Sequence, residues 1–112
     1  LWRKRLGGGM RQAGVLAAAG LHALDHHYDR LAEDHEHARL LATRLGLDPG
    51  AVETNIVVVD GVDAPKVAEA AKAQGVLVGQ VGATRLRLVT HLDVDRAGVD
   101  RAVEVLGPLV AA

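Results

Sequence analysis

Hydrophobic and polar positions repeat with two different periods along this chain. Spacings of three to four residues predict helices at residues 9–24, 25–45, 64–74 and 95–110. Short β-branched or alternating runs bounded by turn residues predict strands at residues 55–59, 76–78 and 85–91. The expected order is α-α-β-α-β-β-α. It predicts an α+β fold with a small antiparallel or mixed sheet of about three strands covered by helices.

The first predicted helix, residues 9–24, is apolar on nearly every face. Such a helix is expected to be buried on all sides, and a domain of 112 residues can hardly bury one so completely. We therefore expect residues 1–24 to form an interdomain loop and a buried helix covered by another domain or subunit. Residues 25–112 would form a small C-terminal domain. A central helix in a small bundle is the alternative.

The composition and net charge limit the kinds of partner expected for this chain, but they do not identify one. The net charge of −1 and the lack of long apolar runs indicate neither a nucleic-acid nor a membrane partner. The absence of cysteine excludes disulfides and is typical of a reducing compartment, so we expect a cytoplasmic protein. The basic opening at residues 1–5 lacks the apolar stretch of a signal peptide, and we expect the chain to begin inside a longer protein.

The predicted strand at residues 85–91 carries the most informative polar residues. Because side chains alternate across a strand, Leu86 and Leu88 should face the helices. Arg85, Arg87 and His91 should share the other face. A guanidinium binds a carboxylate through a planar fork, so the pattern indicates a carboxylate-binding arginine that faces a cleft. An open sheet face with solvated arginines is the alternative on the pattern alone.

A glycine-rich segment offers a second candidate site. Gly7, Gly8 and Gly9 let the backbone approach a ligand closely, and they precede a predicted helix whose N-terminus would attract anions. Arg11 would lie in the first turn of that helix, where a cation is unfavourable unless an anion is present. The segment therefore indicates a phosphate or carboxylate site. A flexible hinge with solvated charges explains it equally well.

Other reactive side chains do not form a recognisable catalytic or metal-binding pattern. His22 and His26 could share a helix face, but no cysteine or HExxH pattern accompanies them, so we expect no metal site. Lys4, Lys66 and Lys72 are the only lysines, and none stands in the apolar setting that covalent carbonyl chemistry needs. We therefore expect no catalytic residue in this chain.

Two longer motifs resemble a known family. The segment RKRLGGGMRQAG at residues 3–14 and the segment RLVTHLDV at residues 87–94 closely resemble segments of low-specificity L-threonine aldolases. The triplet at residues 33–35 and the pair Thr54-Asn55 also fall where that family's pattern would put them. The resemblance covers the whole chain in order, and GGGMRQ is unusual in any other setting.

The resemblance implies a fold and a reaction. It implies the C-terminal small domain of a pyridoxal 5′-phosphate (PLP) enzyme of fold type I, the aspartate-aminotransferase-like superfamily. Such an enzyme cleaves L-threonine and L-allo-threonine to glycine and acetaldehyde, and forms a homotetramer built as a dimer of dimers. The lysine that carries PLP would lie outside this chain, so the chain alone is expected to be inactive.

The resemblance also assigns roles to residues of this chain. Arg87 matches the arginine that binds the substrate carboxylate, while Lys4 and Arg11 match basic residues that reach the cofactor phosphate of a neighbouring subunit. Residues in possible supporting roles are Gly7, Gly8, Gly9, Arg85 and His91. Three alternatives stay open: a related PLP-dependent lyase of β-hydroxy amino acids, a free-standing α+β module that binds a carboxylate or a partner protein, and a degenerate remnant without a function.

Overall fold

The chain consists of two compact units. The computed structural model describes residues 1–111 and divides the chain into Leu1–Arg30 and Leu31–Ala112. The predicted boundary between residues 24 and 25 precedes this division, because the second helix of the chain continues through Asp25 to His26. The helix predicted at residues 25–45 therefore begins at Leu31 and not at Asp25. The assignment of residues 1–24 to a region between domains stays a prediction.

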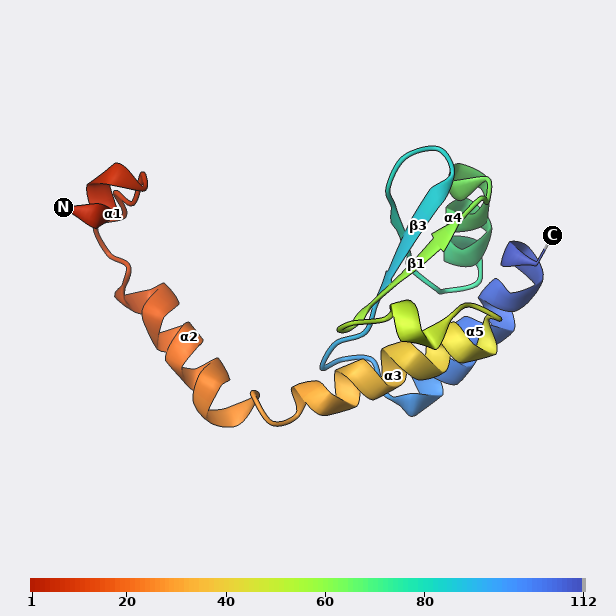
Figure 1. The fold of residues 1–112 in the computed structure, drawn as a ribbon, viewed down its shortest axis with the longest axis horizontal. Helices are drawn as coiled ribbons and strands as arrows, with labels where there is room; N and C mark the ends of the chain where they lie inside the picture. Colours follow the sequence, from red (N-terminus) through yellow and green to blue (C-terminus); the bar gives the residue numbers. More distant parts are fainter. Residues whose placement is uncertain (112) are drawn as a thin grey trace. The chain divides into compact units, whose positions relative to one another are not determined.

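The Leu1–Arg30 unit contains two helices, α1 (Trp2–Arg5) and α2 (Gly14–His26) (Figure 1). The sequence pattern did not predict α1, a single turn. It also placed the start of α2 at Gly9, which is wrong, because the helix begins at Gly14. No residue of α2 is buried within this chain, so its covering by another domain or subunit stays a prediction.

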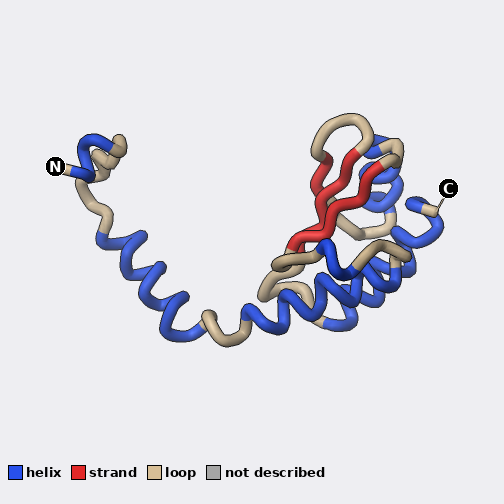
Figure 2. The backbone as a smooth tube through the Cα atoms, viewed as in Figure 1, coloured by secondary structure: helices blue, strands red, loops and turns tan. Residues whose placement is uncertain are grey.

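The Leu31–Ala112 unit holds an antiparallel sheet with strand order β1-β3-β2 (Figure 2). The strands are β1 (Ile56–Asp60), β2 (Gly79–Gln80) and β3 (Arg85–Val89). The helices are α3 (Leu31–Arg44), α4 (Ala64–Ala73) and α5 (Arg96–Val110), with a short 3-10 helix η1 (Pro49–Ala51). The predicted α+β class and three-stranded sheet are confirmed, while α1 and η1 extend the predicted order of elements.

The sheet packs on the helices through one face only. In β1, Val57 and Val59 are buried and their neighbours are exposed, and Leu86 and Leu88 repeat this alternation in β3. Residues of all three helices of this unit complete the core: Ala38, Leu41, Ala42, Ala64, Val67, Ala71, Val99, Val105 and Leu106. The opposite face of the sheet is exposed along both strands, which leaves it available for chemistry.

Both later strand boundaries differ from the sequence prediction. The strand predicted at residues 76–78 is wrong, because Gly75 adopts a positive φ of 81° and the Val76 amide donates to the Ala71 carbonyl, which closes α4. Pairing with β3 begins only at Gly79. The strand predicted at residues 85–91 ends at Val89, so His91 lies beyond it.

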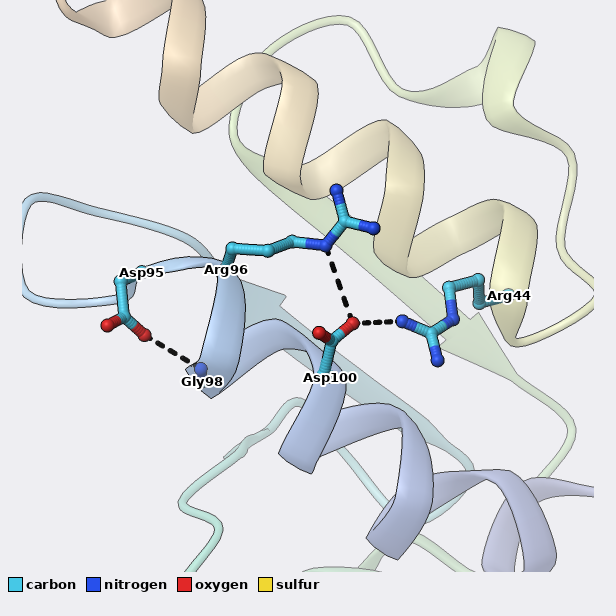
Figure 3. A network of polar contacts seen from close by, with 5 residues as sticks. All are labelled: Arg44, Asp95, Arg96, Gly98 and Asp100. Carbon is cyan, nitrogen blue, oxygen red and sulfur yellow. Dashed lines mark hydrogen bonds and ion pairs between the residues drawn. The ribbon is translucent and has the colours of Figure 1, made fainter.

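Polar contacts fix the start of α5 and join it to α3 (Figure 3). The Asp95 carboxylate accepts a hydrogen bond of 2.8 Å from the Gly98 amide, which satisfies a free N–H of the first turn. Asp100 of α5 pairs with Arg44 of α3 and lies 3.4 Å from the Arg96 Nε. Because these ion pairs are exposed, they stabilise the fold only slightly. Among the helices of residues 1–111, none combines the length and apolar character needed to cross a membrane.

Candidate functional site

Arg87 occupies the middle of the sheet. It lies on β3, the central strand, between Val58 of β1 and Gly79 of β2. Its side chain is exposed on the face opposite the core, as the alternation predicted. Within residues 1–111, no hydrogen bond or ion pair engages its guanidinium. Its five N–H donors are therefore free for an external carboxylate.

The neighbours of Arg87 leave space around it and are partly apolar. A Cβ at position 79 would lie 3.2 Å from the Arg87 carbonyl oxygen and 3.7 Å from its Nε, so glycine keeps the β2 side of this arginine open. Ile56, Val58 and Val89 are partly exposed on the same face.

Arg85 shares this face but has a partner. Its Nε lies 2.5 Å from Asp60 Oδ1 and its Nη2 lies 3.1 Å from Asp60 Oδ2, a two-point contact between residues paired across β1 and β3. The hydrogen bond from Arg85 holds the pKa of Asp60 below its ordinary value, and the same bond raises the pKa of Arg85. The sequence pattern did not distinguish these two arginines, but the structure does. Arg85 is ion-paired with Asp60, whereas the Arg87 guanidinium has no partner within residues 1–111.

His91 does not join Arg87 in the way that alternation predicted. β3 ends at Val89, and His91 lies in the following turn, where its Nδ1 accepts a 3.3 Å hydrogen bond from the Asp93 amide. The ring lines a cavity of about 360 Å³ between the end of β3, residues 75–78 and α5. Arg87 is not among the residues that line this cavity. The strand does not continue to position 91, so the prediction that His91 and Arg87 share a strand face is wrong.

Lys4 and Arg11 belong to the Leu1–Arg30 unit and are considered separately. Both side chains are exposed, and within residues 1–111 neither has a hydrogen-bond or ion-pair partner. Arg11 lies in a turn before Gly14, the first residue of α2, so its predicted place in the first helical turn is wrong. By charge, an ammonium and a guanidinium free of partners suit a phosphate group.

Gly7 and Gly8 have a local structural reason to be glycine. Gly7 follows α1 with a positive φ of 79°, which side chains disfavour. The Gly8 amide donates a 2.7 Å hydrogen bond to the Arg3 carbonyl, and a Cβ on Gly8 would lie 3.0 Å from that oxygen. A Cβ on Gly9 would meet nothing within 4 Å. Closing α1 therefore accounts for two of the three glycines, and a ligand-contact role for any of them stays a prediction.

The histidines of α2 are close to one another. The ring centroids of His22 and His26 lie 4.4 Å apart, so the two side chains do share a helix face. In the part of the chain that the structure describes, no three side chains of histidine, cysteine, aspartate or glutamate are placed to hold a metal ion. We assign these histidines no role.

Sequence reasoning missed a buried polar contact beside the Arg87 strand. Thr90 follows β3 directly, is only 2% exposed, and donates a 2.6 Å hydrogen bond from Oγ1 to the Asp34 carbonyl of α3. Asn55, which precedes β1, donates from Nδ2 to the Thr90 carbonyl at 2.7 Å. The signal was present in the motifs that contain these residues, but only the folded chain shows that they meet.

Known proteins match this chain over most of its length. Residues 1–64 match a family model described as beta-eliminating lyase. The low specificity L-threonine aldolase of Escherichia coli (strain K12) is 46% identical over 100 residues, which cover 85% of this chain and 29% of that protein. The probable low-specificity L-threonine aldolase 2 of Arabidopsis thaliana is 44% identical over 109 residues, covering 88% of this chain and 31% of that protein. The chain thus spans less than a third of the length of the curated relatives it matches.

Proposed function

The chain belongs to the beta-eliminating lyase family, and from this premise we propose that it is the C-terminal small domain of a PLP-dependent L-threonine aldolase of fold type I. The reaction would cleave L-threonine and L-allo-threonine between Cα and Cβ to glycine and acetaldehyde. The observation that carries the proposal is the 46% identity to a relative named for this activity, because the matched segment contains Arg87, the free guanidinium of the sheet.

Arg87 would bind the substrate carboxylate. Its planar fork offers two parallel N–H donors to the two carboxylate oxygens, which fixes the orientation of the amino acid as well as its position. Ile56, Val58 and Val89, which are partly exposed on the same face, would offer the amino acid apolar contacts beside that ion pair. Orientation matters for the chemistry, because it decides which bond of the amino acid the bound cofactor would help to break.

Lys4 and Arg11 would hold the PLP phosphate, and they suit it because both are cationic, exposed and free of partners in the described chain. Bound PLP supplies a sink for the electrons of the broken bond, and the protein supplies binding and orientation. In the proposed homotetramer these two residues would serve a neighbouring subunit, and the lysine that carries PLP would lie outside this chain. The location that we propose is cytoplasmic.

The test compares two arginines on the same face of β3, in the complete PLP-loaded protein that contains this segment. Arg87→Ala removes a charge-assisted contact worth about 1.5–3 kcal/mol, so we expect kcat/KM for L-threonine to fall by about 10- to 100-fold, mainly through KM. Arg87→Lys should recover little of this loss, since an ammonium lacks the planar fork. Arg85→Ala is the matched control and should change KM by no more than a few fold, because Arg85 already pairs with Asp60.

The outcome distinguishes a specific role of Arg87 from a general effect of positive charge on this face of the sheet. Equal losses in the Arg85 and Arg87 variants would indicate a general effect of positive charge and would remove the specific role of Arg87. An unchanged KM in both variants would contradict substrate binding on this face of the sheet.

The family description favours a second candidate reaction, β-elimination from an amino acid. The products decide between the two. The aldolase reaction yields glycine and an aldehyde, whereas β-elimination yields ammonia and a 2-oxo acid. We expect glycine and acetaldehyde from L-threonine, and release of ammonia without glycine would establish the second candidate instead.

A further inference from the structure

We propose that Thr90 and Asn55 are positioning residues for Arg87, which hold the end of β3 so that the guanidinium keeps its direction on the open face of the sheet. The inference rests on the proposed function, because it concerns the arginine that would bind the substrate carboxylate. It goes beyond that function in assigning roles to two residues that would not touch the substrate.

Three segments far apart in the sequence converge at Thr90. Its Oγ1 donates to the Asp34 carbonyl of α3 at 2.6 Å, and its amide donates to the Asn55 carbonyl at 3.0 Å. The Asn55 side chain completes the contact by donating to the Thr90 carbonyl at 2.7 Å. Thr90, at the end of β3, is thereby hydrogen-bonded both to the start of α3 and to the residue before β1. We call Asp34, Asn55 and Thr90 the β3 anchor.

The β3 anchor controls two properties of the strand that carries Arg87. The bonds between Thr90 and Asn55 continue the β1–β3 pairing by one residue, so they oppose a slip in register that would turn Arg87 toward the core. The bond to Asp34 ties the strand end to α3, which sets the direction in which β3 leaves the sheet. Arg87 is only three residues from Thr90, so a change in that direction moves its guanidinium.

The chemistry of these residues distinguishes anchoring from simple packing. A buried side chain that served only to fill space at position 90 could be valine, which has the same shape as threonine. Threonine adds a hydroxyl whose hydrogen bond to the Asp34 carbonyl fixes a direction, and valine would lose this hydrogen bond. A misplacement of about 1 Å at a group that positions substrate can cost up to about 100-fold in rate.

The experiment measures KM and kcat for L-threonine in the complete PLP-loaded protein. Thr90→Val should raise KM by about 10-fold and change kcat less, while Thr90→Ser, which keeps the hydroxyl, should restore KM to within about 2-fold. Asn55→Ala, at a half-buried site, should raise KM in the same direction and serves if Thr90→Val does not fold. Val105→Ala, in the part of the core supplied by α5, is the control for loss of stability and should leave KM unchanged.

A second readout does not depend on turnover. The dissociation constant of glycine, followed by NMR at the Arg87 Nε–H, should rise by the same factor as KM in Thr90→Val. If Thr90→Val and Val105→Ala leave KM equally unchanged while Arg87→Ala raises it, the positioning role is wrong and the proposed function stands. If Arg87→Ala itself leaves KM unchanged, the proposed function fails, and the positioning role fails with it.

Discussion

The one-sided packing of the sheet can be tested with two valines that are adjacent in β1. Val57 is 2% exposed and faces the helices, while Val58 is 47% exposed and lies beside Arg87 on the open face. Val57→Ala and Val58→Ala remove the same two carbons from the same strand. Both also exchange a β-branched residue for one that strands disfavour, so this loss is common to the two variants. The difference between them therefore reports burial.

The magnitudes follow from these exposed fractions. Burial of a methylene-sized group contributes about 0.8 kcal/mol, so Val57→Ala loses about 1.6 kcal/mol of transfer free energy. The cavity left in a close-packed core adds to this, and the total is about 2–3 kcal/mol. Val58 is about half exposed and leaves no closed cavity, so its truncation should cost about 1 kcal/mol or less. The expected difference in the free energy of unfolding is about 1.5 kcal/mol.

The assay is urea unfolding of this chain, followed by far-UV circular dichroism. A folded unit of this size is stabilised by about 4–12 kcal/mol, so both losses lie within the measurable range. The midpoint should fall clearly further for Val57→Ala than for Val58→Ala, with unchanged slopes. Equal losses would mean that both faces of β1 are packed, and the exposed site around Arg87 would then not exist in solution.

Two further predictions concern charge and association. Arg85 holds the pKa of Asp60 below its ordinary value of 3.8, so this pair stabilises the fold above that pH, and the contribution disappears as the pH falls through the lowered pKa. Asp60→Asn should therefore flatten the acid limb of the profile of stability against pH, and an unchanged acid limb in this variant would contradict the role of the pair. The exposed Leu16 and Leu21 of α2 should make this chain self-associate, so sedimentation velocity should show concentration-dependent assembly that Leu16→Lys with Leu21→Lys abolishes; a monomer at all concentrations for the unaltered chain would contradict it.

The strands show what periodicity could predict and what it could not. The alternation of Leu86 and Leu88 with two arginines specifies which face of β3 packs, because a strand has a period of two residues. The residues that pair with β3 on its other edge could not be predicted, since Val76 and Val78 have strand-like sequences but pack partly buried against the core before the pairing begins. The intrinsic propensity of these valines favours a strand, but tertiary packing determines whether they pair in the sheet.

The candidate site was likewise only partly predictable from the sequence. A pattern in the sequence could place two arginines on one face, but their difference depends on Asp60, 25 residues earlier, and on the register that sets it opposite Arg85. The helix start at Gly14 rather than Gly9 similarly removed the helical argument for Arg11. The resemblance at residues 3–14 and 87–94 carried more functional information than the periodicity, because it depends on side-chain identity rather than on hydrophobic spacing.

The alternation within β3 has a consequence for how variants of this protein should behave. Leu86 and Leu88 hold the strand to the helices, while Arg87 between them has no partner in the described chain and contributes little to the core. Changes at the two leucines should therefore lower stability first and function only through unfolding. Changes at Arg87 should lower substrate binding in a protein that remains folded. Thr90 belongs to neither group, because its buried hydroxyl stabilises the strand end and at the same time sets the direction of Arg87. If the β3 anchor acts as proposed, Thr90→Val should lower stability and raise KM together, and Thr90→Ser should restore both.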